Sequence, residues 1–237
     1  SFPFKISYDA VDDRLHDFFL PVLERSVRYH RSTGFFSSGA LAQAATGIVR
    51  LIQNGGTMRI LCGAQLSVED VEALRKGASL TGKVSEAMVG CLKDPTDESM
   101  KARLEALAWL VAQGRLDIKV VLPRGADGHP MAAQDCRDYY HPKEMVFEDA
   151  EGNLVGTTGS NNESQNGWEH HYETFSVYTS WMRDDPVEPI PAGTCWIRPI
   201  QFRMKALWEG RNPGWIAMDI PAAAKAKLQK FTPKSDP

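Results

Sequence analysis

The sequence predicts an α/β fold in which helices cover a sheet. Residues 26–77 alternate strand and helix patterns, and this alternation is typical of parallel strands joined by helical crossovers. The chain has 237 residues and 43% hydrophobic content, which is enough to bury a sizeable core. These properties suit one large domain, or one domain with an appendage.

The first half of the chain supplies most of the predicted helices. In chain order we expect helix 11–25, strand 26–36, helix 38–54, strand 57–63, helix 67–77, helix 97–113 and strand 116–122. Ser67 and Asp70 have the spacing of a capping box, and Gly114 follows the clearest amphipathic helix as a stop signal. Pro21 interrupts the first helical pattern. Residues 78–96 are ambiguous and fit a helix followed by a loop.

The second half begins with a loop over 123–138 that is rich in turn residues. The elements expected after it are strand 139–147, strand 171–180, a proline-rich arm over 183–199, helix 201–210, strand 215–220 and helix 221–231. We therefore divide the chain into a main domain, 1–182, and an arm with a helix–strand–helix extension, 183–237.

Polar residues between 141 and 173 carry the strongest functional signal. His141 and Lys143 are two positions apart, so they would share one face of a strand. Gly152-Asn153 lies between VFE and LVG and predicts a hairpin, which would bring the Gly-Ser-Asn-Asn of 159–162 beside His141. A nucleophilic imidazole beside a fixed positive charge suits a phosphate ester, and Ser and Asn offer neutral donors to phosphate oxygens.

This arrangement resembles the phospholipase D superfamily, whose signature is H-x-K, then G-S-x-N, then a downstream acid. The matching residues are His141, Lys143, Gly159, Ser160, Asn162 and Glu173, with Ser164 fitting a frequent extended form. The family often has Asp five residues after the Lys, where this chain has Glu148 followed by Asp149. The resemblance implies a mixed, mostly parallel sheet with helices on both faces, and cleavage of a phosphodiester, most simply DNA, without a metal or other cofactor.

The resemblance also implies a two-step reaction. One His attacks phosphorus to form a phosphohistidine, a second His protonates the leaving oxygen, and water hydrolyses the intermediate. The catalytic candidates are His141, Lys143, Ser160, Asn162 and Glu173. Lys143, Ser160 and Asn162 would stabilise the developing negative charge, and Glu173 would hold His141 through its other ring nitrogen. We see no second H-x-K motif, so we expect a homodimer whose two His141 form one composite site.

Candidate substrate-binding residues lie first in a basic cluster over 25–31. Arg28, His30 and Arg31 are the candidates there, because basic side chains contact nucleic-acid phosphates. On a strand, Arg28 and His30 would share one face while Tyr29 and Arg31 share the other, so half of the cluster at most would line one groove. Ordinary solvated charge is the alternative interpretation.

Two further substrate-binding candidates, Trp168 and His171, follow the G-S-x-N motif. Trp168 could wall the site or stack on a base, although core packing is the interpretation that we favour for it. His171 would share a strand face with Glu173 and contact substrate. A metal site is the alternative there, since two His and a carboxylate are competent ligands, but the adjacent His170 would face the other way.

Composition limits the partners and the setting. The net charge is −3 and the sequence pI about 6.1, so any phosphate-binding surface must be a local patch. No apolar run approaches the roughly 18–20 residues that span a bilayer, and no signal-peptide pattern is seen. The cysteines, Cys62, Cys91, Cys136 and Cys195, lie far apart and form no CxxC. We therefore expect a reduced, cytoplasmic setting.

The expected partners are DNA and a second copy of the chain. The GFFSSGAL stretch and the ending LWEG…DIPAAAKAKL resemble nuclease-like domains that precede helicase modules in larger bacterial proteins, including defence and restriction systems. The start at Ser1 without Met fits a segment of such a protein. Two other functions stay open, namely a lipid phosphodiesterase using the same residues and a non-catalytic module for nucleic-acid binding or dimerisation.

Overall fold

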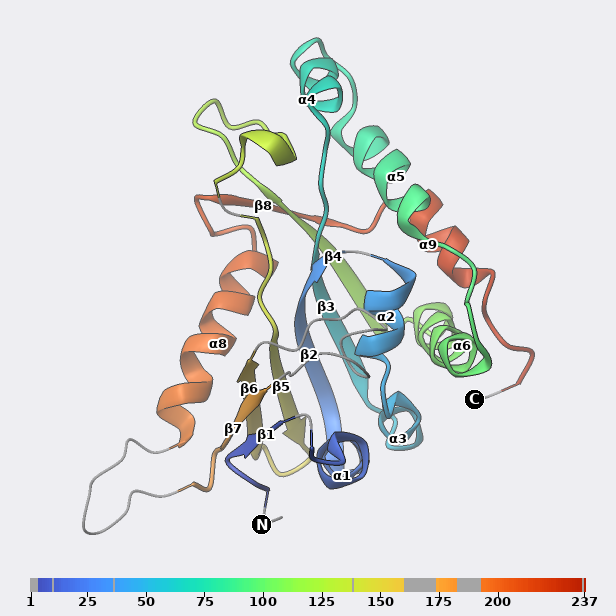
Figure 1. Ribbon diagram of the computed structural model, residues 1–237, viewed down its shortest axis with the longest axis vertical. Coiled ribbons are helices and arrows are strands. Elements are labelled where there is room, and N and C mark those ends of the chain that lie inside the picture. The colour runs from blue at the N-terminus through green and yellow to red at the C-terminus, as the bar shows by residue number, and fades with distance from the viewer. Residues whose placement is uncertain are drawn as a thin grey trace.

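The computed structural model describes residues 4–9, 11–35, 37–137, 139–159, 174–182, 193–235 and 237. Within these ranges, eight strands form one mixed sheet in the order β1-β7-β6-β5-β2-β3-β4-β8. Helices pack on both faces of this sheet (Figure 1). The predicted fold class, an α/β fold with a mixed sheet flanked by helices, is therefore confirmed.

Parallel pairing is confined, among the described strands, to β2–β3 and β3–β4, and every other pairing is antiparallel. The strands are β1 (Ser7–Tyr8), β2 (Ser26–Phe35), β3 (Thr57–Gly63), β4 (Leu116–Pro123), β5 (Glu144–Asp149), β6 (Leu154–Gly159), β7 (Phe175–Thr179) and β8 (Trp215–Asp219). The parallel part is smaller than the resemblance implied. The two parallel pairs are those joined by helical crossovers, with α2 and α3 between β2 and β3, and α4, α5 and α6 between β3 and β4.

The helices differ from the expected ones mainly where Gly or Pro lies inside a predicted span. They are α1 (Leu20–Arg25), α2 (Ser38–Ala44), α3 (Ile48–Gln53), α4 (Val68–Arg75), α5 (Leu80–Cys91), α6 (Glu98–Ala112), α8 (Gly193–Trp208) and α9 (Ala222–Gln229). The predicted helix 38–54 is two helices, because α2 ends at Ala44 and Gly47, the N-cap of α3, has a left-handed φ of 72° that breaks the helical run. Helix α1 begins at Leu20, with Pro21 as its second residue, directly after a π-helical turn over Leu15–Phe19. The helical backbone therefore continues through Pro21, where an interruption was predicted.

One face of the sheet is covered by α8, which lies at the left of the sheet in Figure 1. The contact is apolar and comprises Leu61, Val121, Tyr140, Val146, Ile197, Ile200, Met204 and Leu207. The other face holds the larger core under α1, α2, α3 and α6. Phe18 is at its centre and contacts the rings of Tyr8, Phe147 and Phe175, so it ties β1, β5 and β7 together.

The hairpin predicted from Gly152-Asn153 is confirmed. Strands β5 and β6 pair from Glu144↔Thr158 to Glu148↔Leu154. The Asp149 carboxylate closes the turn by accepting hydrogen bonds from the backbone N–H of Glu151 (3.0 Å) and Asn153 (2.8 Å). Gly152 has φ 82°, a conformation that glycine adopts without strain.

The proline-rich arm predicted over 183–199 is helical from Gly193, so that part of the prediction is wrong. Apolar residues recur at helical spacing on both sides of Pro199, and their burial against the sheet offsets the hydrogen bond that proline cannot donate. Beyond α8, strand β8 pairs with β4, and Lys227 of α9 donates to the backbone carbonyl of Val89 (2.9 Å). The domain boundary at residue 182 stays a prediction, although these elements join the same sheet and its helical cover.

In the part of the chain that the structure describes, no helix combines the length and the apolar character that crossing a membrane requires.

Candidate active site

His141 and Lys143, the two residues of the H-x-K motif, contact each other in the segment that directly precedes β5 in the chain. The distance between Lys143 Nζ and His141 Nδ1 is 2.9 Å, and both side chains are partly buried. The predicted strand 139–147 begins only at Glu144, so this contact forms in the segment that leads into the sheet. A lysine ammonium has donors and no acceptor, so it donates to Nδ1, and the neutral ring carries its proton on Nε2.

The end of β2 holds the His141 ring in place. A Cβ added to Gly34 would lie 2.5 Å from His141 Cδ2 and 3.0 Å from Nε2, so the ring occupies the space that a side chain would fill. The residue before it is anchored through Tyr140 OH, which donates to Ser32 Oγ at 3.0 Å. The exposed Tyr139 ring packs edge-on against the imidazole with 5.5 Å between centroids.

This environment favours the neutral form of His141. Burial lowers the pKa of the imidazole below its ordinary value of 6.5, and the positive charge of Lys143 lowers the pKa further. A neutral imidazole is the form that attacks phosphorus, because protonation removes the lone pair. The site therefore favours the nucleophilic state of His141 at neutral pH.

The hairpin brings the beginning of the G-S-x-N motif to the same end of the sheet. Glu144, directly after Lys143, pairs with Thr158, directly before Gly159. Gly159 pairs with Phe175, and a Cβ on it would lie 2.3 Å from the Thr174 carbonyl oxygen, so only glycine allows this approach. The motif glycine and the start of β7 thus converge beside the H-x-K segment.

Five predicted site residues lie outside the described residues, and their roles stay predictions: Ser160, Asn162, Trp168, His171 and Glu173. The described chain ends and resumes close to the site, since Gly159 is the last residue of β6 and Phe175 is the first of β7. Of the predicted catalytic residues, the structure therefore brings together His141 and Lys143. It also describes Gly159 and Thr174, the residues on either side of the segment that contains Ser160, Asn162 and Glu173.

Glu148, which lies five residues after Lys143, has a structural role in this chain. Glu148 accepts from Arg28 Nε at 2.9 Å and from the same guanidinium through Nη2. Its neighbour Asp149 accepts backbone and side-chain hydrogen bonds within the hairpin turn. The Glu148 carboxylate therefore links β5 to β2, and the Asp149 carboxylate stabilises the hairpin turn after β5.

The basic cluster of β2 does not converge on His141. Arg28 is engaged by Glu148, while Arg31 is buried on the opposite face of the strand, where it donates to Tyr29 OH at 3.0 Å. His30 faces α8 and lines a cavity described below. The expected alternation of faces is present, and the structure does not bring the three candidate side chains together.

A residue that sequence reasoning missed is Arg203 of α8, which forms an ion pair with Glu144 beside Lys143. Nothing in the local sequence relates these residues, because they are far apart along the chain. Gly34 was also missed, although a glycine inside a strand pattern is a signal of close approach. Tyr139 adds an exposed aromatic ring next to the candidate nucleophile.

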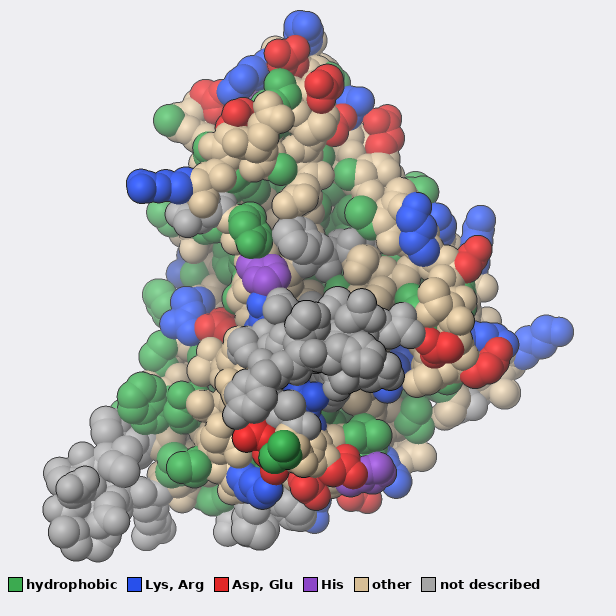
Figure 2. Space-filling view, in the orientation of Figure 1, with side chains coloured by type: hydrophobic (Ala, Val, Ile, Leu, Met, Phe, Trp, Pro, Cys, Tyr) green, Lys and Arg blue, Asp and Glu red, His purple; other side chains and the backbone are tan. Residues whose placement is uncertain are grey.

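Within the described ranges, no three His, Cys, Asp or Glu side chains gather with the geometry of a metal site. The alternative metal ligands His170, His171 and Glu173 lie outside these ranges. On the face drawn in Figure 2, Lys and Arg side chains are interspersed with Asp and Glu. This pattern agrees with the small net charge of the chain.

Comparisons with known proteins give similarity of shape at low identity. No protein-family model and no curated protein sequence matches the chain. Phosphatidylserine synthase of Haemophilus influenzae aligns over 95% of this chain and 44% of its own, with 11% identity and a TM-score of 0.42. Polyphosphate kinase of Porphyromonas gingivalis aligns over 98% and 28%, with 10% identity and a TM-score of 0.44.

Yeast tyrosyl-DNA phosphodiesterase aligns over 76% of this chain and 33% of its own, with 9% identity and a TM-score of 0.39. The chain spans less than half the length of each of these three proteins. At these identities and TM-scores, the likeness carries no information on substrate or activity.

Proposed function

We propose that the chain is a metal-independent phosphodiesterase of phospholipase D type that cleaves DNA with His141 as its nucleophile. The observation that supports this most is the 2.9 Å contact between Lys143 Nζ and His141 Nδ1 beside the glycine of the G-S-x-N motif. A nucleophile, a fixed cation and the start of a donor loop meet at one end of the sheet. The proposed phosphohistidine route would use those three components.

In the proposed first step, His141 Nε2 attacks phosphorus, a P–N bond forms, and the P–O bond to the leaving nucleoside breaks. The negative charge of the bound phosphate would favour protonation of one imidazole of the pair, and His141 of the partner subunit, in this protonated form, would donate its proton to the leaving oxygen. In the second step the same partner imidazole takes a proton from water, whose oxygen attacks phosphorus and breaks the P–N bond. Each imidazole returns to its starting state, so the cycle consumes one water and one phosphodiester.

Lys143 would change partners during this cycle. Without substrate it donates to His141 Nδ1, which leaves the proton on Nε2. A phosphate between the two subunits would attract the ammonium, and Nδ1 would then be free to donate to the Glu173 carboxylate. When the ring proton moves from Nε2 to Nδ1 by exchange with solvent, the Nε2 lone pair becomes available to attack phosphorus. The cation would stabilise the phosphoryl oxygens in the transition state.

The test is cleavage of end-labelled single- and double-stranded DNA in EDTA by the wild type, His141→Ala and His129→Ala. His129 is exposed, belongs to neither motif and serves as the matched control. We expect cleavage in EDTA by the wild type and by His129→Ala, and a loss of at least a thousandfold in His141→Ala. Acid-labile label retained on the wild-type protein would mark the phosphohistidine.

Three outcomes would overturn the proposal. Cleavage abolished by EDTA and restored by Mg²⁺ would replace it with metal-dependent hydrolysis. Turnover of phosphatidylcholine vesicles without DNA cleavage would identify a lipid enzyme that uses the same residues. A wild-type protein that hydrolyses no phosphodiester but binds the labelled DNA would be a binding module.

A further inference from the structure

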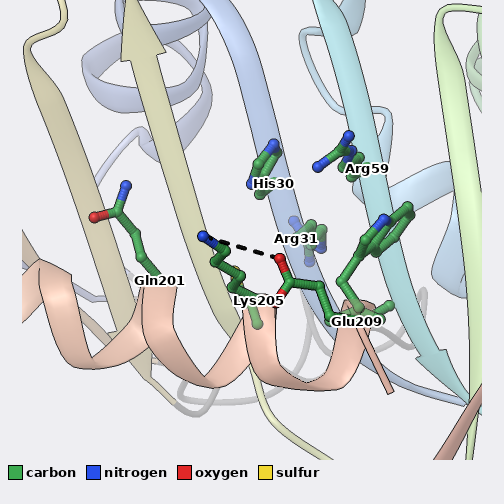
Figure 3. Close-up of a pocket in the computed structure, with 9 residues that line it drawn as sticks. His30, Arg31, Arg59, Gln201, Lys205 and Glu209 are labelled. Atoms are coloured by element: carbon green, nitrogen blue, oxygen red, sulfur yellow. Dashed lines mark ion pairs between the residues drawn. The ribbon is translucent and has the colours of Figure 1, made fainter. Parts of the chain in front are cut away.

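A cavity of about 210 Å³ lies between the sheet and the second half of α8, away from the candidate active site. Strands β2 and β3 form its floor and α8 forms its wall, as Figure 3 shows. Its lining comprises His30, Arg31, Arg59, Leu61, Gln201, Met204, Lys205, Trp208 and Glu209. None of these residues belongs to the H-x-K or G-S-x-N motif.

The cavity and the ion pair of Arg203 with Glu144 lie on different sides of α8. Gln201 and Lys205 are one helical turn apart and line the cavity, whereas Arg203 lies on the opposite side of the helix and pairs with Glu144 next to Lys143. The cavity is therefore a second site. Any ligand in it would contact the helix that also holds the segment carrying Lys143.

The cavity contains positive charge that the described residues compensate only in part. Arg59 lies over the Trp208 ring, 5.0 Å from its centroid, and within the described chain its guanidinium makes no ion pair. Lys205 is 3.9 Å from Glu209, which is a long ion pair. Glu209 is engaged more closely by Arg211, whose Nε donates to it at 2.7 Å. The Glu209 charge is thus directed mainly to Arg211.

His30 adds a further polar group on the cavity floor. It is the register partner of Arg59 in the parallel pair β2–β3, so the two side chains lie next to each other. Burial lowers the pKa of His30, and the Arg59 charge lowers it further. In the described part of the chain no hydrogen bond occupies the His30 ring, and a neutral imidazole still offers one N–H donor.

The remaining lining is apolar and limits the size of a ligand. Leu61, Met204 and the Trp208 ring stand beside the cationic groups. The volume of about 210 Å³ is below the roughly 300 Å³ at which typical small-molecule pockets begin. A group with a compact anionic end and a small organic body fits this combination better than a polymer chain.

We propose that this cavity binds the phosphate group of a small organic phosphate monoester, no larger than a nucleoside monophosphate. Arg59 and Lys205 match the two negative charges of such a phosphate, and Gln201 and His30 supply neutral donors around it. Leu61 and Met204 contact the organic part. The proposal does not depend on the activity proposed for His141.

The test is calorimetric titration of the intact chain with adenosine 5′-monophosphate, with orthophosphate and adenosine as reference probes. We expect the monophosphate to bind and adenosine to bind at least tenfold more weakly. Lys205→Gln and Arg59→Gln should each weaken monophosphate binding at least tenfold. The matched control Lys225→Gln, an exposed lysine on α9, should leave binding unchanged. Glu209→Gln should strengthen binding, because it removes the carboxylate that competes for Lys205.

Several results would overturn the proposal. They are an absence of monophosphate binding at millimolar concentration, equal binding of adenosine, or an affinity unaffected by both Lys205→Gln and Arg59→Gln. A thymidine decamer that binds more tightly than the monophosphate, and loses affinity in the same variants, would identify a nucleic-acid phosphate as the occupant instead. Circular dichroism shows whether Arg59→Gln is still folded, so that a loss of binding in this variant can be told apart from unfolding. DNA cleavage by the wild type, measured separately, tests only the function proposed for His141.

Discussion

Lys143 Nζ lies 2.9 Å from His141 Nδ1, and this contact determines which ring nitrogen carries the proton in the neutral imidazole. An ammonium only donates, so Nδ1 accepts and Nε2 is protonated. The proposed attack needs the opposite tautomer, with a lone pair on Nε2. Substrate binding therefore has to break the contact between Lys143 and His141 before the chemistry begins.

Replacing Lys143 with Met should raise the pKa of His141. In the wild type, burial and the Lys143 charge both lower that pKa below 6.5, so the ring stays neutral to lower pH than a free His. Lys143→Met removes the charge and leaves most of the burial, so the pKa rises but stays below 6.5. NMR titration of the ring, assigned by its absence in His141→Ala, measures the change. An unchanged pKa would mean that the contact does not persist in solution.

Gly34→Ala should weaken the proposed DNA cleavage while the chain still folds. The new Cβ would meet His141 Cδ2 at 2.5 Å, so the ring must move from its position. We expect at least a tenfold loss of DNA cleavage and about 1–3 kcal/mol of lost stability, the usual cost of overpacking.

The control for this variant is Gly90→Ala, at an exposed position of α5 where an added Cβ meets nothing within 4 Å. It should leave cleavage unchanged and stabilise the helix by about 0.5–1 kcal/mol. Urea denaturation gives both free energies of unfolding. Full activity in Gly34→Ala would show that the His141 ring position is not critical.

The two neighbouring acids of β5 should differ in their effect on stability. Asp149→Ala removes an acceptor from the backbone N–H of Glu151 and of Asn153 at the hairpin turn, and should cost about 1–2 kcal/mol. Glu148→Ala removes a surface ion pair with Arg28 and should cost about 0–1 kcal/mol. Urea denaturation of the two variants measures both losses of unfolding free energy and shows which one is larger. A larger loss in Glu148→Ala would assign the structural role to that carboxylate.

Subunit mixing tests the composite site. If one catalytic event uses His141 from both subunits, heterodimers with His141→Ala are inactive. Activity then falls with the square of the wild-type fraction when the proteins are mixed and exchanged. Mixing with His129→Ala should cause no such fall. A linear decrease with His141→Ala would show that each chain acts alone, and light scattering would establish whether a dimer forms.

The sequence predicted much of the fold because its signals are local. Ser67 and Asp70 form the expected capping box, and Gly152-Asn153 forms the expected turn. Errors arose where burial overrode a local preference. Pro199 indicated an arm, yet the apolar spacing around it packs against the sheet and keeps α8 helical. Gly47 had the opposite effect, since its left-handed conformation divided one predicted helix into two.

For the candidate site, the sequence alone determined the residue types and their order: His141 and Lys143, then Gly159 after a turn. The chemistry of an imidazole and an ammonium belongs to the side chains and needs no coordinates. Only the tertiary structure decided that Gly34 makes room for the ring, that Arg203 holds Glu144, and that His30 and Arg59 share a cavity with Lys205. These relationships join distant segments of the chain, and distances between such segments are set by how strands and helices pack, which no local pattern encodes.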